Sequence, residues 1–368
     1  MDVENQMEMK EIKRNHCVFC EKELCSIRKL NQPIYECVEY GTNVEWVMEY
    51  GYCPECFSVQ LMSLIDPEIL YDEHYFQPLH HSYLWIHHNI SFVQFIIEHL
   101  NTDTYDSILE IGSSSFCLGK HLIHYYPKYT VFDYTLKNAE QKENIRYIEG
   151  NCESYPFTDE TIVLSHVFEH LYNPKAFLQN CTKNKVQNIF IAVPSMEDPE
   201  QLHVTNQHTF LYSDKDLEYL FGLSHYKVNK KVSYNSKDHS FPCLFFHFVW
   251  TDTIVPIERD LCVTRHNYSC DYLNREIIVP PNTFLATCGM FSLITYAMIV
   301  NKENVIGVID TNKKKQWKRF GNTSLIIYPY EKLHEYGSET SILVFHPKKN
   351  NIIQQIRDTN SDIQILSV

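Results

Sequence analysis

The chain has 368 residues, of which 44% are hydrophobic and 21% charged, as in globular proteins, so wholesale disorder is excluded. Its net charge of −14 argues against a protein that grips nucleic acid along its surface. The N-terminal residues lack the apolar core of a signal peptide, and apolar stretches such as Phe291–Val300 reach about half the length of a membrane-spanning helix. We therefore expect a cytoplasmic protein with neither a nucleic-acid nor a membrane partner.

Six of the 13 cysteines fall within the first 56 residues, and an odd, crowded set suggests a metal site before disulfides. Four of them form two pairs with two intervening residues each: Cys17 and Cys20, and Cys53 and Cys56. Two such pairs can complete a tetrahedral site of four thiolates with no open position, so we predict a structural zinc ion. Cys25 and Cys37 would be spare thiols, and redox-active or incidental cysteines are the alternative.

The pattern divides the chain into residues 1–65, rich in cysteine and turns, and two blocks, 66–255 and 256–368, that alternate strand-like and helix-like runs. In the middle block we expect strands at Ser107–Ile111, Thr130–Phe132, Arg146–Ile148, Thr161–Leu164 and Asn188–Val193, and helices at Asn89–Leu100, Gly119–Tyr126, Asn173–Asn180 and Lys215–Phe221. In the last block we expect strands at Thr283–Thr287, Val305–Ile309, Leu325–Ile327 and Ile342–Phe345, and a helix at Met290–Val300. This alternation predicts an α/β fold of two mostly parallel sheets with helices on both faces, behind a small zinc-binding domain.

The first strand of the middle block leads into a turn of small residues. Gly112 can adopt a backbone conformation that other residues resist, and the small Ser113 lets a ligand approach the main chain. The next strand ends in Asp133, 21 residues after Gly112, where a carboxylate can accept both hydroxyls of an adenosine ribose. This pattern is typical of a cofactor site, and a surface turn acid is the alternative for Asp133.

With the segments Tyr147–Phe157 and Asp159–Pro174, these residues resemble class I S-adenosylmethionine-dependent methyltransferases. That family has a strand ending in Glu-x-Gly, an acid after the second strand, a polar residue after the third and His-Val-x-Glu-His after the fourth. The loop here lacks the family's second and third glycines. The resemblance implies S-adenosylmethionine as cofactor, bound by Glu110, Gly112 and Ser113 along its methionine part, Asp133 at its ribose, Asn151 and Cys152 beside its adenine, and His166.

The segment His166-Val-Phe-Glu-His170 also fits H-x-x-E-H, a zinc-peptidase pattern in which two histidines one helical turn apart bind the metal. A peptidase would carry it in mid-helix with a third ligand downstream. Here it follows an expected strand, where methyltransferases carry the same letters, so we favour the methyltransferase interpretation. For His170, helix capping or packing is the alternative.

Segments at both ends of the chain extend the likeness. Cys53–Leu61 and Asp66–Tyr75, together with Leu285–Gly289 and Val305–Lys315, resemble sugar C-methyltransferases of deoxysugar biosynthesis. In that family a zinc-binding domain precedes the methyltransferase domain, and a second Rossmann-like domain follows it. The resemblance implies a nucleotide-linked sugar held between the two sheets. Asp310 would be a ribose or sugar contact, or simply a turn acid.

Methyl transfer from a sulfonium is an in-line displacement, so the enzyme must align the nucleophile and often remove a proton. Histidine suits the proton transfer because its pKa lies near neutrality. In the sugar C-methyltransferases a Tyr-His-Glu-His-like stretch after the fifth strand supplies the base, and Thr205-Asn-Gln-His-Thr209 corresponds to it here. The resemblance implies His208 as the general base, and the missing tyrosine and acid leave carbon and oxygen open as acceptor atoms.

Tyr75 and either His87 or His88 lie where the family has substrate-facing residues, with surface or packing roles as the alternative; of the two histidines we favour His88. The leading hypothesis is thus a methyltransferase acting on a nucleotide-activated deoxysugar. The other two are a methyltransferase on RNA or protein that reads its substrate with the zinc domain, and a binding or scaffold relative without catalysis.

Overall fold

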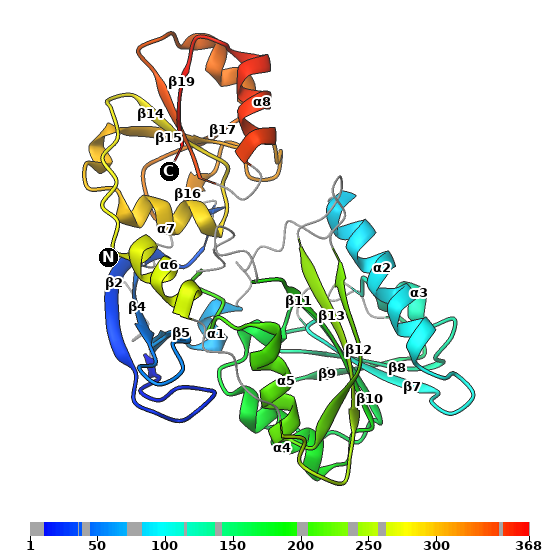
Figure 1. Cartoon of the computed structure of the whole chain (residues 1–368). Coiled ribbons are helices and arrows are strands. Elements are labelled where there is room, and N and C mark those ends of the chain that lie inside the picture. The colour runs from blue at the N-terminus through cyan, green and yellow to red at the C-terminus, as the bar shows by residue number, and fades with distance from the viewer. Residues whose placement is uncertain are drawn as a thin grey trace, which may run out of the picture.

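The structure, a computed structural model, describes residues 11–35, 37–38, 45–71, 83–113, 116–136, 142–196, 205–234, 242–256, 263–345 and 349–367. Tyr75 lies outside these ranges. Figure 1 shows the N-terminal strands beneath a C-terminal α/β unit, with a larger sheet to one side of both. Within the described ranges, no helix is long and apolar enough to span a membrane.

The larger sheet carries the strands predicted for the middle block and two more. Its described strands are β7 (Ser107–Ile111), β8 (Lys128–Asp133), β9 (Ile145–Glu149), β10 (Thr161–Ser165), β11 (Asn188–Pro194), β12 (Tyr226–Tyr234) and β13 (Cys243–Trp250). They lie in the order β12-β13-β11-β10-β7-β8-β9. Strands β7 to β11 are parallel, and β13 runs antiparallel to both β11 and β12. This mixed sheet, with its parallel strands β7 to β11, confirms the predicted α/β fold.

Helices cover both faces of this sheet, as the alternation predicts. They are α2 (Tyr83–His99), α3 (Gly119–Leu122), α4 (Pro174–Lys183) and α5 (Asp214–Leu223). Successive residues of β11 point to opposite faces. Phe190 packs in one buried cluster with Phe92 of α2, whereas Ile191 packs in another with Phe177 of α4 and Leu217 of α5. The central strands are therefore buried on both sides.

The N-terminal part is a small antiparallel unit. It contains β2 (Cys25–Pro33), β4 (Glu45–Tyr52) and β5 (Val59–Leu61) in one sheet, β1 (Ile12–Lys13) paired with β6 (Ser63–Leu64), and the short helix α1 (Pro67–Leu70). Asp66 caps α1 by accepting the Glu68 amide. Pro67 follows at the first helical position, where a backbone N–H would have no partner within the helix, so the missing N–H of proline costs no hydrogen bond.

The C-terminal part is a second, fully parallel sheet, as predicted. Its described elements are β14 (Thr283–Ala286), β15 (Val305–Ile309), β17 (Ile327–Tyr328), β18 (Ser341–Val344) and β19 (Gln364–Ser367), in the order β17-β15-β14-β18-β19, with α7 (Met290–Met298) and α8 (Lys349–Thr359). Asp310, just after β15, accepts the amides of Cys288 and Asn312 through its two carboxylate oxygens, at 2.7 and 2.6 Å. It thus ties two loops together as a turn acid.

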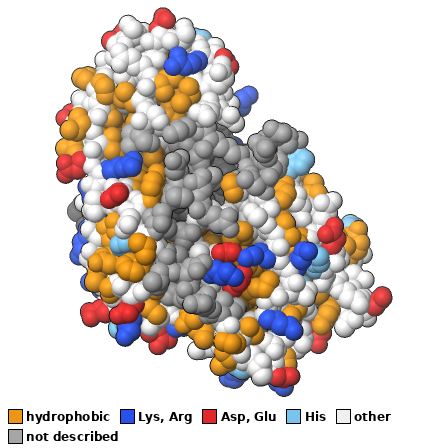
Figure 2. All heavy atoms as spheres, in the orientation of Figure 1, with side chains coloured by type: hydrophobic (Ala, Val, Ile, Leu, Met, Phe, Trp, Pro, Cys, Tyr) orange, Lys and Arg blue, Asp and Glu red, His pale blue; other side chains and the backbone are white. Residues whose placement is uncertain are grey.

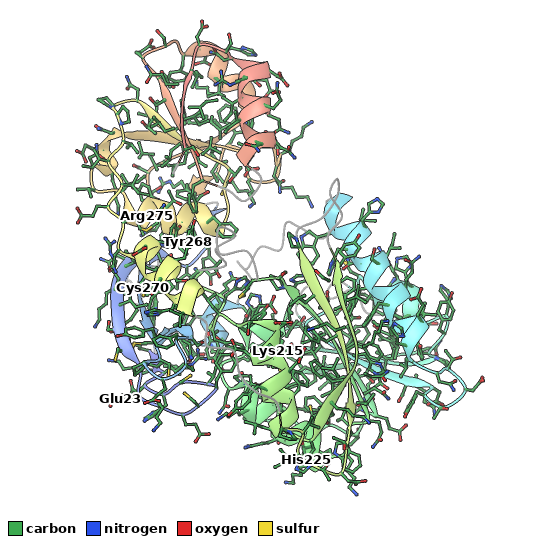
Figure 3. The ribbon with its side chains drawn as sticks, viewed as in Figure 1. Glu23, Lys215, His225, Tyr268, Cys270 and Arg275 are labelled. Carbon is green, nitrogen blue, oxygen red and sulfur yellow. The ribbon has the colours of Figure 1, made fainter. Side chains whose placement is uncertain are left out.

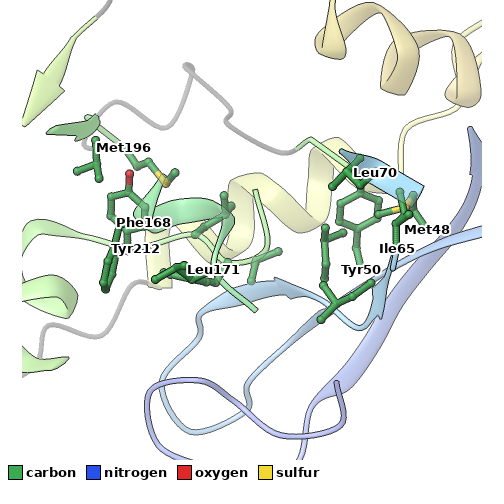
Figure 4. Packing of buried hydrophobic residues seen from close by; sticks show 14 of the residues in the cluster. Met48, Tyr50, Ile65, Leu70, Phe168, Leu171, Met196 and Tyr212 are labelled. Atoms are coloured by element: carbon green, nitrogen blue, oxygen red, sulfur yellow. The ribbon is translucent and has the colours of Figure 1, made fainter. Parts of the chain in front are cut away.

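The three parts are joined by shared packing. One buried cluster runs from Tyr50 and Leu70 in the N-terminal part to Phe168 and Tyr212 beside the large sheet, and its middle is drawn in Figure 4. The short strand β16 (Arg319–Phe320) pairs with β3 (Cys37–Val38), which links the first part to the last. Helix α6 (Val263–Leu273) lies alongside β2, and Figure 3 labels Tyr268, Cys270 and Arg275 along and just after it.

Arg14 fastens the N-terminal part to the large domain. Its buried guanidinium donates to the carbonyls of Thr209 and, at 2.7 Å, Tyr172. A planar, five-donor group can serve several carbonyls at once, which lysine cannot do in the same geometry. Arg14 thereby holds the segment around Thr209 against the N-terminal part, which carries the two cysteine pairs of the predicted zinc site.

Candidate functional site

A cavity of about 450 Å³ lies at the carboxyl ends of β7, β8, β9 and β10. In open α/β sheets this edge is where ligands bind, and the volume is within the range of small-molecule sites. Five of the seven predicted cofactor residues line it: Gly112, Asp133, Asn151, Cys152 and His166. The structure thus brings together residues spread over more than 50 positions of the chain.

The turn after β7 requires the glycine it has. Gly112 has a φ of +77°, in the region that favours glycine, and its amide donates to the Phe132 carbonyl at 2.8 Å. A Cβ at this position would lie 2.3 Å from Cγ2 of Val167. The absence of a side chain therefore lets the turn pass close to the segment that follows β10, and it leaves the main chain facing the cavity.

Glu110 and Ser113 lie behind this turn and do not line the cavity. Glu110 is 3% exposed and accepts the Tyr129 hydroxyl at 2.6 Å. Burial raises the pKa of Glu110 to about 7, a rise opposed by hydrogen bonds from Ser113, Tyr129 and the Gly119 main chain. Glu110 thus anchors the loop between β7 and α3 from inside, which shapes the cavity wall indirectly.

Polar groups at the ends of β8 and β9 face the cavity. Asp133 ends β8 and accepts the Thr135 amide through Oδ1 at 3.4 Å. Asn151 accepts the Glu153 amide at 2.8 Å, which fixes the turn after β9. Burial raises the pKa of the Cys152 thiol, so this thiol is neutral and forms an apolar part of the wall. At the ends of β8 and β9 the site therefore offers the carboxylate of Asp133 and the amide of Asn151.

The opposite wall of the cavity is formed largely by residues that the sequence did not predict. Tyr71, Tyr134 and Tyr172 line the cavity, together with Ile12 and Asp66 from the N-terminal part. The rings of Tyr71 and Tyr134 are 5.9 Å apart. Tyr134 and Tyr172 follow β8 and η2 of the large domain, whereas Ile12, Asp66 and Tyr71 reach the cavity through the docking of the N-terminal part, for which no local pattern in the sequence gives a signal.

No family model and no curated protein matches this chain. Solved structures do resemble it. One is a 1,6-didemethyltoxoflavin-N1-methyltransferase of Burkholderia thailandensis with bound 1,6-didemethyltoxoflavin and S-adenosylhomocysteine, at 11% identity and a TM-score of 0.36, covering 45% of this chain and 78% of that one. Another is an S-adenosylmethionine-dependent methyltransferase of Clostridium acetobutylicum, at 10% identity and a TM-score of 0.36, covering 44% and 92%.

A third similar structure is the magnesium protoporphyrin IX methyltransferase of Synechocystis with bound S-adenosylhomocysteine. Its identity is 8% and its TM-score 0.36, and the match covers 46% of this chain and 84% of that one. The roles of individual residues rest on the geometry of this chain alone.

The His166–His170 segment does not form the helix that a zinc peptidase needs. His166 has a left-handed φ of +55°, and only the short 3₁₀ turn η2 (Phe168–His170) follows. The two histidines consequently face different neighbours. His166 lies 3.7 Å from Cys243 Sγ, whereas the ring centroid of His170 is 5.1 Å from that of His208. The alternative of a peptidase-type histidine pair is therefore wrong for this segment.

His208 lies next to His170, which lines the cavity, and is not itself among the lining residues. Thr205 Oγ1 accepts the His208 amide at 2.9 Å and so fixes the turn that presents the imidazole. On its other side, the Thr209 amide donates to the Glu169 carbonyl at 3.0 Å. The threonine that replaces the expected tyrosine thus has a structural task, and the predicted base is held beside the segment that follows β10.

His88, on α2, is fully buried rather than open to solvent. Its Nε2 lies 3.4 Å from Ser165 Oγ, and its ring centroid is 4.8 Å from that of His166. Burial lowers the pKa of His88 well below its usual value, so the ring is neutral. This places His88 behind His166 as seen from the cavity, and its direct contact with a substrate stays a prediction.

The four predicted zinc ligands converge. Their sulfur atoms all lie within 4.8 Å of one another, with Cys17 Sγ 3.5 Å from Cys56 Sγ and Cys20 Sγ 3.3 Å from Cys53 Sγ. Zn–S bonds of about 2.3 Å in a tetrahedron put sulfurs about 3.8 Å apart, so the cluster fits the ion after a small expansion.

The two knuckles around these thiols have the same backbone. In each, the residue after the second cysteine is left-handed, Glu21 at +63° and Phe57 at +59°, and its amide donates to the carbonyl of the first cysteine. Gln60 Nε2 also donates to Cys17 Sγ at 3.0 Å, a contact that suits a thiolate. Cys25 is exposed and outside the cluster, in line with a spare thiol.

Proposed function

We propose that the chain is an S-adenosylmethionine-dependent methyltransferase. The observation that carries the proposal is the cavity at the carboxyl ends of β7 to β10, with the Gly112 turn and Asp133 on its wall. The turn would lie along the methionine part of the cofactor, Asp133 would accept the ribose hydroxyls, and Asn151 and Cys152 would flank the adenine. When bound, S-adenosylmethionine supplies a methyl group activated by a sulfonium.

We further propose that the acceptor is a nucleotide-activated deoxysugar. Support comes from the order of a thiolate cluster, a methyltransferase-type sheet and a second parallel sheet along one chain. The chain's acidity does not oppose a diphosphate, because a few local cations or main-chain amides suffice to bind one. The acceptor has to approach from the side of His170, where His208 would activate it.

The acceptor class is tested with mass spectrometry. The full chain is incubated with S-adenosylmethionine and 4-keto, 4-amino and fully hydroxylated nucleotide sugars in deuterated water. We expect a gain of one methyl group on at least one of them. Ring deuteration of a 4-keto sugar without cofactor would indicate an enolate and a carbon acceptor. Methylation of unactivated sugars at the same rate, or of none in the panel, would contradict a nucleotide-sugar acceptor.

A methyltransferase on RNA has less support. On the face shown in Figure 2, the described Lys and Arg side chains are interspersed with Asp and Glu and form no continuous basic patch. Phosphate-backbone binding depends on such a patch. We propose instead that the thiolate cluster is structural, with zinc held by Cys17, Cys20, Cys53 and Cys56 and no open coordination position for a substrate.

A further inference from the structure

Beside the cavity lies a second group of metal-ligating side chains, made of Glu169, His170 and His208. One nitrogen or oxygen of each lies within 4.8 Å of those of the other two. Metal–nitrogen and metal–oxygen bonds of about 2.0–2.2 Å require ligand atoms about 3 Å apart, which small side-chain rotations can reach from this arrangement. The group differs from the thiolate cluster in its chemistry, because it offers two imidazoles and one carboxylate.

The carboxylate of Glu169 is the feature that points to a cation. Glu169 is fully buried, and neither of its carboxylate oxygens has a hydrogen-bond partner. An ionised carboxylate buried without partners costs several kcal/mol, and buried charges are normally paired or bound to a metal.

One histidine ring lies within ion-pair distance of this carboxylate without a hydrogen bond to it. His166 Nδ1 lies 3.3 Å from Glu169 Oε1 but makes no hydrogen bond to it. A bound metal ion would pair this buried carboxylate with a positive charge. Neutral imidazoles and a carboxylate are the protonation states that metal ligands must have.

Like Glu169, His170 has a buried polar atom that is available to bind a metal ion. It lines the cavity, and its buried Nδ1 has no hydrogen-bond partner. The Gln207 carbonyl accepts a hydrogen bond from the ring. Metal-binding histidines commonly donate their second nitrogen to a carbonyl, which fixes the tautomer and orients the ring. The segment Thr205–Thr209 thus both orients His170 and supplies His208.

A nearby group of His88, His166 and Cys243 is a poorer candidate. It contains no carboxylate, whereas the favoured group has a buried carboxylate whose two oxygens lack hydrogen-bond partners. His88 and His166 also pack against each other and against Trp85, with ring centroids 4.8 to 5.3 Å apart. We therefore interpret the group of His88, His166 and Cys243 as packing beside the site.

We propose that Glu169, His170 and His208 bind one divalent transition-metal ion at the edge of the cavity. Two imidazoles and one carboxylate leave further coordination positions open, as in catalytic rather than structural sites. On the proposed function, an ion held here would act as a Lewis acid and favour oxygen as the methylated atom. An acceptor hydroxyl bound to it would release its proton to solvent, and its oxygen would take the methyl group as S-adenosylhomocysteine leaves. His208 would then activate the acceptor as a metal ligand, because a nitrogen bound to a metal cannot also accept a proton.

The test is a titration of the zinc-containing full chain with Mn²⁺ alone, without S-adenosylmethionine, with free Mn²⁺ followed by electron paramagnetic resonance. Mn²⁺ is chosen because it prefers oxygen and nitrogen to thiolates, so it does not compete for the cysteine cluster. We expect one Mn²⁺ per chain, with affinity at least about tenfold weaker in Glu169→Gln and in His208→Ala. The matched controls are the exposed Glu160→Gln and His124→Ala, which should bind like the wild type.

Thermal unfolding of each variant is measured to check that it is folded. Glu169→Gln is chosen because it keeps the size of the side chain. Absence of Mn²⁺ binding to the wild type, or binding that survives both variants, would overturn the metal site. Binding of S-adenosylhomocysteine by the same samples is measured separately. A wild-type chain that binds S-adenosylhomocysteine but no Mn²⁺ refutes the metal site alone, whereas a wild-type chain that binds Mn²⁺ but no S-adenosylhomocysteine refutes the proposed function.

Discussion

Replacing Cys53 by serine is expected to empty the thiolate cluster and unfold the N-terminal part. The segment carrying β2, β4 and β5 is small, and zinc bound by four thiolates supplies roughly 10 kcal/mol or more of folding free energy to such a unit. Its core is continuous with that of the large domain through Tyr50 and Leu70. We therefore expect the melting temperature of the whole chain to fall by at least about 10 °C.

Elemental analysis and differential scanning calorimetry measure this effect. Cys25→Ser is the matched control, because Cys25 is an exposed thiol of the same segment outside the cluster. It should keep one zinc per chain and the wild-type melting temperature. A Cys53→Ser protein that retained stoichiometric zinc and wild-type stability would show that the cluster is not a structural zinc site.

Gly112→Ala is expected to destabilise the chain by about 2–5 kcal/mol and to abolish cofactor binding. A φ of +77° costs a residue with a Cβ roughly 1–2 kcal/mol, and the close approach to Val167 adds an overpacking cost of about 1–3 kcal/mol. Relief of the contact would push the turn after β7 into the cavity. Urea denaturation and titration with S-adenosylhomocysteine measure the two losses.

Gly150→Ala provides the matched control for stability within the same cavity wall. A Cβ at Gly150 meets only Phe132 Cζ, at an ordinary distance of 3.6 Å, so its stability should stay within about 0.5 kcal/mol of the wild type. Adding Val167→Ala to Gly112→Ala should restore the steric part of the loss and leave the backbone part. Equal stability of Gly112→Ala and Gly150→Ala would contradict the close approach.

The parallel strands could be predicted because each is a short apolar run bounded by turn residues. Ser107–Ile111 and Val305–Ile309 match β7 and β15 residue for residue. Strand β12 was not predicted, because its exposed face carries Lys227, Lys230 and Lys231 and the apolar positions are interrupted by a register shift between Val228 and Lys230. A charged edge strand protects a sheet from pairing with other chains. The same lysines remove the apolar pattern by which a strand is predicted from the sequence.

The candidate site was predictable where its residues follow strand ends. Gly112, Asp133, Asn151 and His166 converge because the carboxyl ends of parallel strands meet at one edge. The pairing of Glu169 with His208 was not predictable, because the two are brought together by the packing of a turn 39 positions further along the chain. The H-x-x-E-H motif correctly marks residues of the site. Its structure differs from that of a peptidase helix because His166 has a left-handed backbone, which turns the two histidines toward different neighbours.

The most direct test of the central claim is a calorimetric titration of the full chain with S-adenosylhomocysteine, with Asp133→Ala beside the wild type. We predict one site per chain, with affinity about 10–100-fold weaker in Asp133→Ala because a hydrogen bond to a charged group is lost. Asp106→Ala, which removes a carboxylate paired with Lys128 on the surface, should bind like the wild type. No binding by the wild type, or equal binding by Asp133→Ala, would contradict the assignment of this cavity as the cofactor site.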